Sequence, residues 1–322
     1  MRYLAVFDHF LTEAHRRQVD AAAERCGFSA VYCRRIDGLT PADLERCEVL
    51  YGDPQPDEIP RFPNVKWVCV SSAGVNRYVD DAIYPGPDVI LSNSSGAYGL
   101  TISEHILMVT LMLLRRMPVY MAAAARREWQ PDLPLRSLSG SRVTVLGTGD
   151  IGTAFARRAK ALGAAHITGV RRTLRPADPA FDAVTTFAGL DHVLPATDVL
   201  VSALPHTRET AGVLSRERIG LLPPHAVLVN VGRGTAVDQD ALLDALKSGR
   251  LAGAALDVMV PEPLPPDHPL WDAPNLILTP HMSGNMSLGQ TCDADVDMFC
   301  ADLERYARGE RPLHAVDRRR GY

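Results

Sequence analysis

Cysteine motifs, long apolar segments and an excess of basic charge are all absent from this sequence of 322 residues. Its six cysteines form no Cys-x-x-Cys pair and no zinc-type spacing, so we expect no metal site and reduced thiols, as in a cytoplasmic protein. The apolar run at 106–114 is too short to cross a bilayer, and the first residues contain no long apolar segment of a secretory signal. We therefore expect neither a membrane protein nor a secreted one.

Basic residues do not outnumber acidic ones. The chain has 34 Lys and Arg against 38 Asp and Glu, a formal net charge of -4. Proteins that bind nucleic acids or membrane surfaces usually carry a basic face, so we expect neither as a partner. The share of hydrophobic residues, 46%, is that of an ordinary globular protein, and the length suggests about two domains.

A glycine-rich turn stands near the middle of the chain. Residues 143–146 predict a strand, residues 153–162 predict a helix, and between them lies Gly147-x-Gly149-x-x-Gly152. In this setting Gly147 permits the tight turn, Gly149 lets a pyrophosphate approach the backbone, and Gly152 lets the helix pack closely on the strand. The phosphates would bind the free N–H groups at the helix N-terminus. The motif therefore predicts a dinucleotide site.

Short apolar strands alternate with helices on both sides of this turn. Strands are predicted at 3–7, 30–33, 49–52, 65–70 and 89–92, and then at 143–146, 166–170, 198–202, 227–231, 252–256 and 276–278. This alternation predicts an α/β protein with two parallel-sheet domains, Rossmann-like or flavodoxin-like. A helix at 99–116, followed by a loop with Trp129 and Pro134, would join the domains, and a last helix at about 288–308 would return to the first. We expect a substrate domain at 1–98 plus 288–322 and a dinucleotide-binding Rossmann domain at 99–287.

The end of the second strand after the turn bears on the choice of cofactor. NAD-binding units of this kind carry an acidic residue there, which holds the ribose 2′-hydroxyl. Here the residues are Arg171, Arg172 and Thr173. Arginine can bind a 2′-phosphate in bidentate fashion, so we expect NADP in preference to NAD. The alternative is a solvated basic turn with no preference, and NAD remains possible.

Three ionisable residues follow late strands of the second domain. Arg233 lies in Gly232-Arg-Gly234, Glu262 follows the strand at 252–256, and His281 follows the strand at 276–278. Ligands of open parallel sheets bind at the carboxyl ends of the strands. Each residue alone is typical of a surface charge or turn, but the three together indicate a reaction centre.

With these motifs the chain resembles the D-isomer-specific 2-hydroxyacid dehydrogenase family over essentially its full length. The matching segments are the Gly147 turn, Leu204-Pro-His-Thr207, 229–234, 256–265, 269–271 and Thr279-Pro-His281. The resemblance implies two α/β domains, the first completed by the C-terminal helix, and a homodimer held largely through the cofactor domain. It also implies reduction of a small 2-keto acid to the (R)-2-hydroxy acid by hydride transfer from a nicotinamide cofactor.

The resemblance also implies roles for single residues. His281 would be the general acid and, in reverse, the base. Glu262 would orient the imidazole and stabilise its protonated form. Arg233 would bind the substrate carboxylate or carbonyl oxygen. Asp257 would accept a hydrogen bond from the nicotinamide carboxamide, unless it is only a helix cap or structural acid.

Cofactor and substrate contacts follow in the same way. The expected cofactor residues are Gly147, Gly149, Asp150, Ile151, Gly152, Arg171, Arg172, Thr173, Leu204, Pro205, Thr207, Val231, Gly232, Asp257 and Gly284. The turn formed by Ser72, Ala73, Gly74 and Val75 offers free backbone N–H groups after a strand, and in this family the matching loop takes the substrate carboxylate. The other interpretation of these four residues is a plain turn.

The sequence differs from some members of this family after the catalytic histidine. Some glyoxylate reductases of the family have a tryptophan shortly after the catalytic histidine, whereas here His281 is followed by Met-Ser-Gly-Asn, so glyoxylate is not assigned.

The same fold also serves as a dinucleotide-sensing, corepressor-like binding protein, which is the alternative function. Short-chain dehydrogenases need Tyr-x-x-x-Lys, which this sequence lacks, and formate dehydrogenases lack the glutamate partner of the histidine. An L-lactate dehydrogenase would place its nucleotide motif near the N-terminus.

Overall fold

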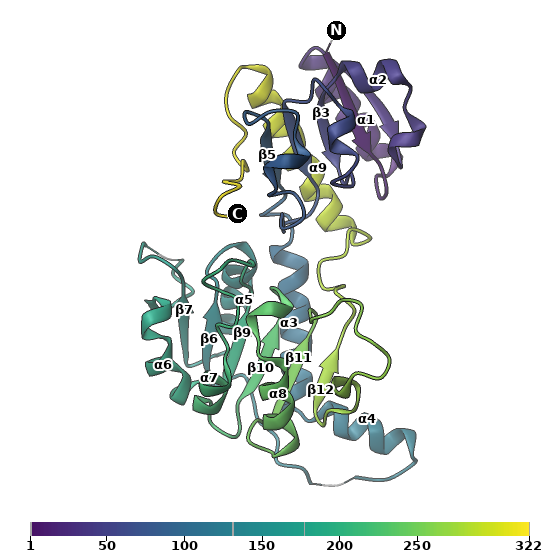
Figure 1. The fold of residues 1–322 in the computed structure, drawn as a ribbon. Helices are drawn as coiled ribbons and strands as arrows, with labels where there is room; N and C mark the ends of the chain where they lie inside the picture. The colour runs from purple at the N-terminus through teal and green to yellow at the C-terminus, as the bar shows by residue number, and fades with distance from the viewer. Residues whose placement is uncertain (1, 131, 177, 322) are drawn as a thin grey trace. The chain divides into compact units, whose positions relative to one another are not determined.

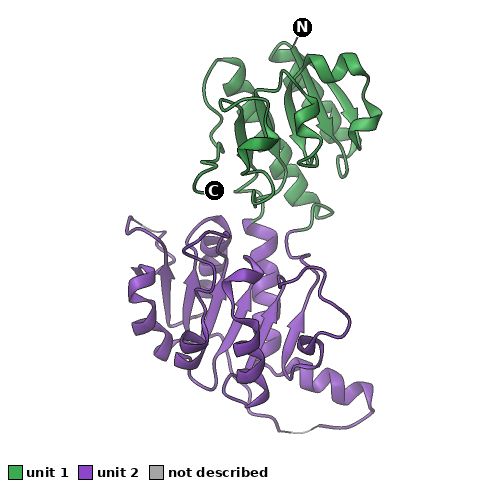
Figure 2. Ribbon diagram, in the orientation of Figure 1, with its two compact units in different colours: residues 1–98, 285–322 green, residues 99–284 purple. Residues whose placement is uncertain are grey.

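The computed structural model describes residues 2–130, 132–176 and 178–321, which form two compact units. Unit 1 consists of Met1–Tyr98 and Asn285–Tyr322, and unit 2 of Gly99–Gly284 (Figure 2). The chain therefore returns to unit 1 after residue 284, whereas the sequence placed this boundary after residue 287.

Unit 1 contains a five-stranded parallel sheet in the order β2-β1-β3-β4-β5. The strands are β1 (Arg2–Phe7), β2 (Phe28–Cys33), β3 (Cys47–Gly52), β4 (Trp67–Val70) and β5 (Ile90–Asn93), and the helices are α1 (Glu13–Arg25), α2 (Pro41–Arg46) and α9 (Gly289–Ala307). Thr12 and Thr40 begin α1 and α2 with capping boxes, in which each threonine side chain accepts from the backbone N–H three residues later.

The C-terminal helix α9 completes the core of unit 1. It packs against α1 and lies among the strands and helices of the first hundred residues (Figure 1). Its Phe299 ring stacks on Tyr51 of β3 at 3.8 Å between centroids and lies 5.6 Å from Trp67 of β4. All three rings are buried, so the unit depends on this late segment for its core, as the family resemblance implied.

The chain after α9 runs along the edge strand β5. Val316 donates its backbone N–H to Leu91 O at 2.8 Å, and His314 O accepts from the N–H of Asn93 at 3.2 Å. This covers backbone groups that an edge strand would otherwise expose. It also fixes the carboxyl end of β5.

Unit 2 contains a seven-stranded parallel sheet in the order β12-β11-β10-β9-β6-β7-β8. The strands are β6 (Arg142–Leu146), β7 (His166–Val170), β8 (Ala183–Thr185), β9 (Val199–Ser202), β10 (Val227–Asn230), β11 (Gly253–Leu256) and β12 (Leu276–Leu278). Six of these match the predicted strands, and the short edge strand β8 was not predicted. The order reverses between β6 and β9, the switch point at which sheets of this kind bind ligands.

The helices of unit 2 include a bent pair that the sequence did not predict as two helices. They are α3 (Gly99–Leu114), α4 (Met117–Ala125), α5 (Asp150–Ala161), α6 (Leu190–Val193), α7 (Arg216–Leu221) and α8 (Gln239–Lys247). Pro118 cannot continue α3 but fits the first turn of a new helix, so a helix replaces the expected loop after residue 116. No single helix in the described residues is long and apolar enough to cross a membrane; α3 and α4 reach that length only together, bent by 71°.

Candidate functional site

The glycines of the 147–152 turn are required by close backbone contacts. Gly147 has φ +95°, and a Cβ there would lie 2.8 Å from Ala203 O. A Cβ on Gly152, in the first turn of α5, would overlap the carbonyl oxygen of Gly147. The turn therefore brings the start of α5 directly against the end of β6, as the motif predicts.

The remaining positions of this turn face open space or a helix end. A Cβ on Gly149 would meet nothing within 4 Å, and no side chain of the described residues caps the N-terminus of α5. The carboxylate of Asp150 lies against Gly99, the first residue of α3, and Ile151 is half-buried beside it. The first N–H groups of α5 lack intrahelical partners, so this end can accept a phosphate.

The end of β7 carries the two predicted arginines and a third. Arg171 donates to Arg175 O and Pro176 O at 3.4 and 3.5 Å, and burial together with the Arg175 charge lowers the pKa of Arg171. Arg172 and Thr173 are exposed in the same turn. Arg175 was not singled out from the sequence.

The loop after β9 approaches the loop after β10. Thr210 braces the first loop by donating to Pro205 O at 2.6 Å and accepting from the N–H of Thr207 at 2.8 Å. A Cβ on Gly232 would lie 2.5 Å from the carbonyl oxygen of the buried Leu204. These residues therefore line neighbouring strand ends, and Val231 is buried between β10 and Gly232.

Arg233 is held in a tight turn at the end of β10. The buried side chain of Asn230 donates to Arg233 O at 2.9 Å and accepts from the N–H of Gly232 at 3.2 Å. A Cβ on Gly234 would overlap the backbone of Met259, so glycine is needed on both sides of the arginine. Burial lowers the pKa of Arg233, and the nearby carboxylate of Glu262 opposes this effect.

Glu262 and His281 form a direct pair. Glu262 Oε2 lies 2.9 Å from His281 Nδ1, and Glu262 Oε1 accepts from the N–H of Met259 at 2.8 Å. The carboxylate is thus fixed from both sides, and half of the histidine side chain is exposed. Because Nδ1 is engaged, Nε2 is the nitrogen that can exchange a proton with a ligand. The backbone of His281 has φ +51°, a left-handed conformation that is uncommon for residues other than glycine.

Asp257 holds the turn that carries His281. Its Oδ1 accepts from Thr279 Oγ1 at 2.6 Å and from the N–H of Met282 at 3.0 Å, and its Oδ2 accepts from the N–H of Ser283 at 3.0 Å. Burial acts to raise the pKa of Asp257, but these hydrogen bonds outweigh it and the net pKa lies below the usual range. The carboxylate therefore supports the turn from 281 to 284, where Gly284 ends unit 2. The sequence left open a structural role for Asp257, and this geometry shows one.

In unit 1, residues 72–75 form a turn directly after β4, which we call the anion loop. Within the described residues of this unit, the backbone N–H groups of Ser72, Ala73, Gly74 and Val75 donate to no acceptor. Successive free N–H groups in a turn form an anion-binding concavity. The loop therefore has the donors that a carboxylate requires.

The structure thus brings Glu262 and His281 into contact and places Arg233 near the glutamate, all within unit 2. Sequence reasoning missed the supporting residues Asn230 and Met259. The asparagine lies two residues before the Gly-Arg-Gly turn, which is a detectable signal, whereas a backbone N–H donor such as that of Met259 leaves none.

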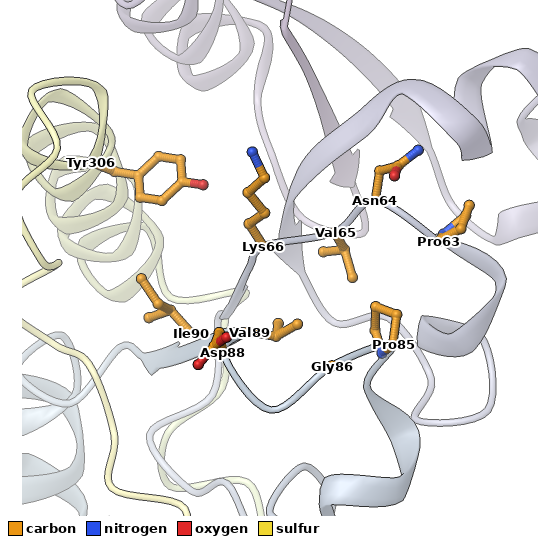
Figure 3. A pocket seen from close by; sticks show the side chains of 10 residues that line it. All are labelled: Pro63, Asn64, Val65, Lys66, Pro85, Gly86, Asp88, Val89, Ile90 and Tyr306. Carbon is orange, nitrogen blue, oxygen red and sulfur yellow. The ribbon is translucent and has the colours of Figure 1, made fainter.

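A surface pocket of about 510 Å³ lies elsewhere in unit 1 (Figure 3). Lys66, Asp88 and Tyr306 are among its lining residues, and the first two precede β4 and β5. The pocket therefore lies at the amino ends of these strands, whereas the anion loop follows the carboxyl end of β4. No predicted site residue lines the pocket. Among the described residues, no group of three or more His, Cys, Asp or Glu could hold a metal ion.

Comparison with known proteins shows the family of the chain. Residues 107–283 match the model of the D-isomer-specific 2-hydroxyacid dehydrogenase NAD-binding domain. A glyoxylate/hydroxypyruvate reductase A from Serratia proteamaculans is 33% identical over 268 residues, covering 80% of this chain and 82% of the relative.

Two solved structures are similar over the whole chain. A D-isomer-specific 2-hydroxyacid dehydrogenase from Xanthobacter autotrophicus, in complex with NADPH and MES, is 31% identical with a TM-score of 0.85, covering 100% of this chain and 99% of that one. An NADPH-dependent glyoxylate/hydroxypyruvate reductase from Sinorhizobium meliloti, in complex with NADP and sulfate, is 29% identical with a TM-score of 0.83, covering 100% of both chains. The chain therefore belongs to the D-isomer-specific 2-hydroxyacid dehydrogenase family, whose members are NAD(P)-binding oxidoreductases.

Proposed function

We propose that this protein reduces small 2-keto acids to (R)-2-hydroxy acids with NADPH, and that His281 donates the proton. The observation that carries the proposal is the contact of 2.9 Å between His281 Nδ1 and Glu262 Oε2 at the end of a parallel sheet. An imidazole that a carboxylate holds at one nitrogen, in a side chain that is half-exposed, suits a general acid.

The reacting groups then have distinct roles. When bound, the cofactor supplies a hydride to the carbonyl carbon of the substrate. His281 Nε2 gives a proton to the carbonyl oxygen, and Glu262 stabilises the imidazolium before this transfer. Arg233, held by Asn230, binds the oxygen on which negative charge develops. Asp257 keeps the His281 turn in place and is also proposed to contact the nicotinamide carboxamide.

Several features of unit 2 fit a dinucleotide with a 2′-phosphate. The open space at Gly149 and the uncapped end of α5 suit the pyrophosphate. Arg171, Arg172 and Thr173 follow β7, where an NAD-specific unit carries an acid. Arg175 adds to the positive charge at this turn. We therefore propose NADP as the preferred cofactor, contacted also by the predicted residues after β9, β10 and β11.

We assign the substrate carboxylate to the anion loop of unit 1. The four free N–H groups of residues 72–75 support this assignment. The relatives from Serratia proteamaculans and Sinorhizobium meliloti are named for glyoxylate and hydroxypyruvate. We therefore propose these two acids as the first substrates to test, although the tryptophan of some glyoxylate reductases is missing after His281.

We further propose that unit 2 mediates a homodimer. Large apolar side chains are exposed on α3, on α4 and just after them: Leu100, Met108, Leu111, Met117, Met121 and Trp129. Residues 100, 108 and 111 lie on one face of α3 because they are separated by eight and three positions. Light scattering should give twice the chain mass for the wild type and a lower mass for Met108→Glu.

The function is tested by following the oxidation of NADPH and of NADH with glyoxylate, hydroxypyruvate, pyruvate and phenylpyruvate. We expect turnover with NADPH, a higher KM for NADH, and (R) configuration in every chiral product. No oxidation of either cofactor with any of the four acids would contradict the proposal. If NADPH binding were then still detectable by fluorescence, a dinucleotide-sensing binding protein would be supported instead.

A further inference from the structure

Every carbonyl group of residues 71–74, from the end of β4 into the anion loop, accepts a hydrogen bond. Ser71 O accepts from Tyr98 Oη at 2.5 Å, and Ser72 O accepts from the N–H of Ser94 at 3.2 Å. Ala73 O accepts from Asn93 Nδ2 at 2.6 Å, and Gly74 O accepts from Ser72 Oγ at 2.8 Å. Four successive carbonyls are therefore held by hydrogen bonds, while the N–H groups of residues 72–75 donate to no acceptor in the described part of unit 1.

The planarity of the peptide bond connects these two facts. In a trans peptide the C=O of one residue and the N–H of the next point in opposite directions. Holding Ala73 O therefore sets the direction of the Gly74 N–H, and holding Ser72 O sets that of the Ala73 N–H. Each carbonyl bond behind the loop thus orients one donor of the anion loop.

Asn93, which donates to Ala73 O, is itself held by hydrogen bonds. It ends β5, the residue is buried, and its backbone N–H donates to His314 O in the segment along the strand. Its side-chain oxygen accepts from the N–H of Ser95 at 3.4 Å, which sets the orientation of the amide. The bond to Ala73 O therefore comes from a rigid element.

The side chain of the neighbouring Ser94 is held by a residue of α9. Its hydroxyl bonds the carboxylate of Asp295 on α9 and lies 3.2 Å from Val70 O. Asp295 is fully buried and accepts from Tyr51 Oη at 2.8 Å. The frame behind the loop therefore extends into the core of unit 1.

We propose that Asn93 is a positioning residue for substrate recognition, which holds the Ala73–Gly74 peptide so that the anion loop presents its N–H groups to the substrate carboxylate. This inference rests on the proposed carboxylate-binding role of residues 72–75. Asn93 acts through the loop, so its loss weakens recognition of the carboxylate without removing a reacting group.

The test compares Asn93→Ala with the control Asn64→Ala. Asn64 Nδ2 also donates to a backbone carbonyl, Glu45 O at 2.7 Å. Asn64 lies before β4, at the amino ends of the strands, whereas the anion loop follows the carboxyl end of β4. KM and kcat are measured for a 2-keto acid and for its uncharged methyl ester, with NADPH varied separately. Calorimetric titration of oxamate into the NADPH complex gives a readout that needs no turnover.

For Asn93→Ala we expect KM of the acid and Kd of oxamate to rise about tenfold, the range of one lost hydrogen bond. KM of the ester, KM of NADPH and kcat should stay within about twofold, and Asn64→Ala should match the wild type in all of them. Tyr98→Phe, which removes only the hydroxyl that holds Ser71 O, should show the same pattern and serves if Asn93→Ala does not fold.

Unchanged constants for the acid and oxamate, or an equal loss for acid and ester, would overturn the role of Asn93. That result is distinct from failure of the proposed function. If the wild type binds oxamate but reduces no keto acid, and Asn93→Ala weakens oxamate binding, the positioning role stands and the reductase proposal falls. If the wild type neither binds oxamate nor reduces any keto acid, both fall.

Discussion

Asp295→Asn should remove a pH dependence of stability that the wild type carries in unit 1. The carboxylate of Asp295 is 0% exposed on α9. Burial raises its pKa from 3.8 to about 6, although hydrogen bonds from Ser94, Tyr51 and Ser71 act in the opposite direction. The nearby carboxylate of Asp53 adds to the increase. Asparagine has the shape of the protonated acid and does not titrate.

The sign of the effect follows from the raised pKa. The folded state binds the proton of Asp295 more tightly than the unfolded state, so protonation stabilises unit 1. This stabilisation is complete below pH 3.8 and is lost as the pH rises through about 6. A rise from 3.8 to about 6 corresponds to about 3 kcal/mol. The free energy of unfolding of Asp295→Asn minus that of the wild type should therefore increase by up to this amount between pH 4 and pH 7.

Urea unfolding at a series of pH values measures this difference. Trp67 is buried in unit 1, so its fluorescence reports on this unit once Trp129 and Trp271 are replaced by phenylalanine. The wild-type and Asp295→Asn chains are compared in that same background. A difference between them that does not change with pH, or that falls as the pH rises, would refute the reasoning.

Three further predictions concern unit 2. Glu262→Gln should lower kcat of keto acid reduction without changing KM for NADPH, because a neutral amide holds the His281 ring less firmly than a carboxylate 2.9 Å away; an unchanged kcat would leave Glu262 a structural role only. Replacing Arg171 and Arg172 together by serine should raise KM for NADPH at least about tenfold and leave KM for NADH nearly unchanged, whereas equal changes for both cofactors would count against 2′-phosphate binding. Gly152→Ala should abolish NADPH binding in a fluorescence titration, because its Cβ would overlap a carbonyl oxygen of the same turn; normal affinity would contradict the close packing described.

The parts of this protein that repeat a general pattern could be predicted from the sequence. The alternation of apolar strands and helices predicted both parallel sheets, and the glycine spacing predicted the turn between β6 and α5. The strand β8 was missed because it has three residues and lies at an edge. The helix α4 was missed because a loop was expected after residue 116, although Pro118 fits the first turn of a helix.

The supporting contacts of the candidate site could not be predicted because they join distant segments. Asn93 and Ser94 hold the anion loop some twenty residues earlier, and Asp295 reaches Ser94 from α9. The oxygens of Asp257 bond to the turn that carries His281, and the sequence could only leave such a structural role open. Such contacts arise only when the sheet has brought its strand ends together.

The most direct test of the proposed chemistry is single-turnover reduction of a 2-keto acid by His281→Gln with saturating NADPH. If His281 Nε2 is the proton donor, the rate should fall by about 10²–10⁴ while Kd for NADPH stays at the wild-type value. Glutamine keeps a polar side chain but cannot supply an acidic proton near neutral pH. A rate within a few fold of the wild type would contradict the account, because the proton would then have to come from another group.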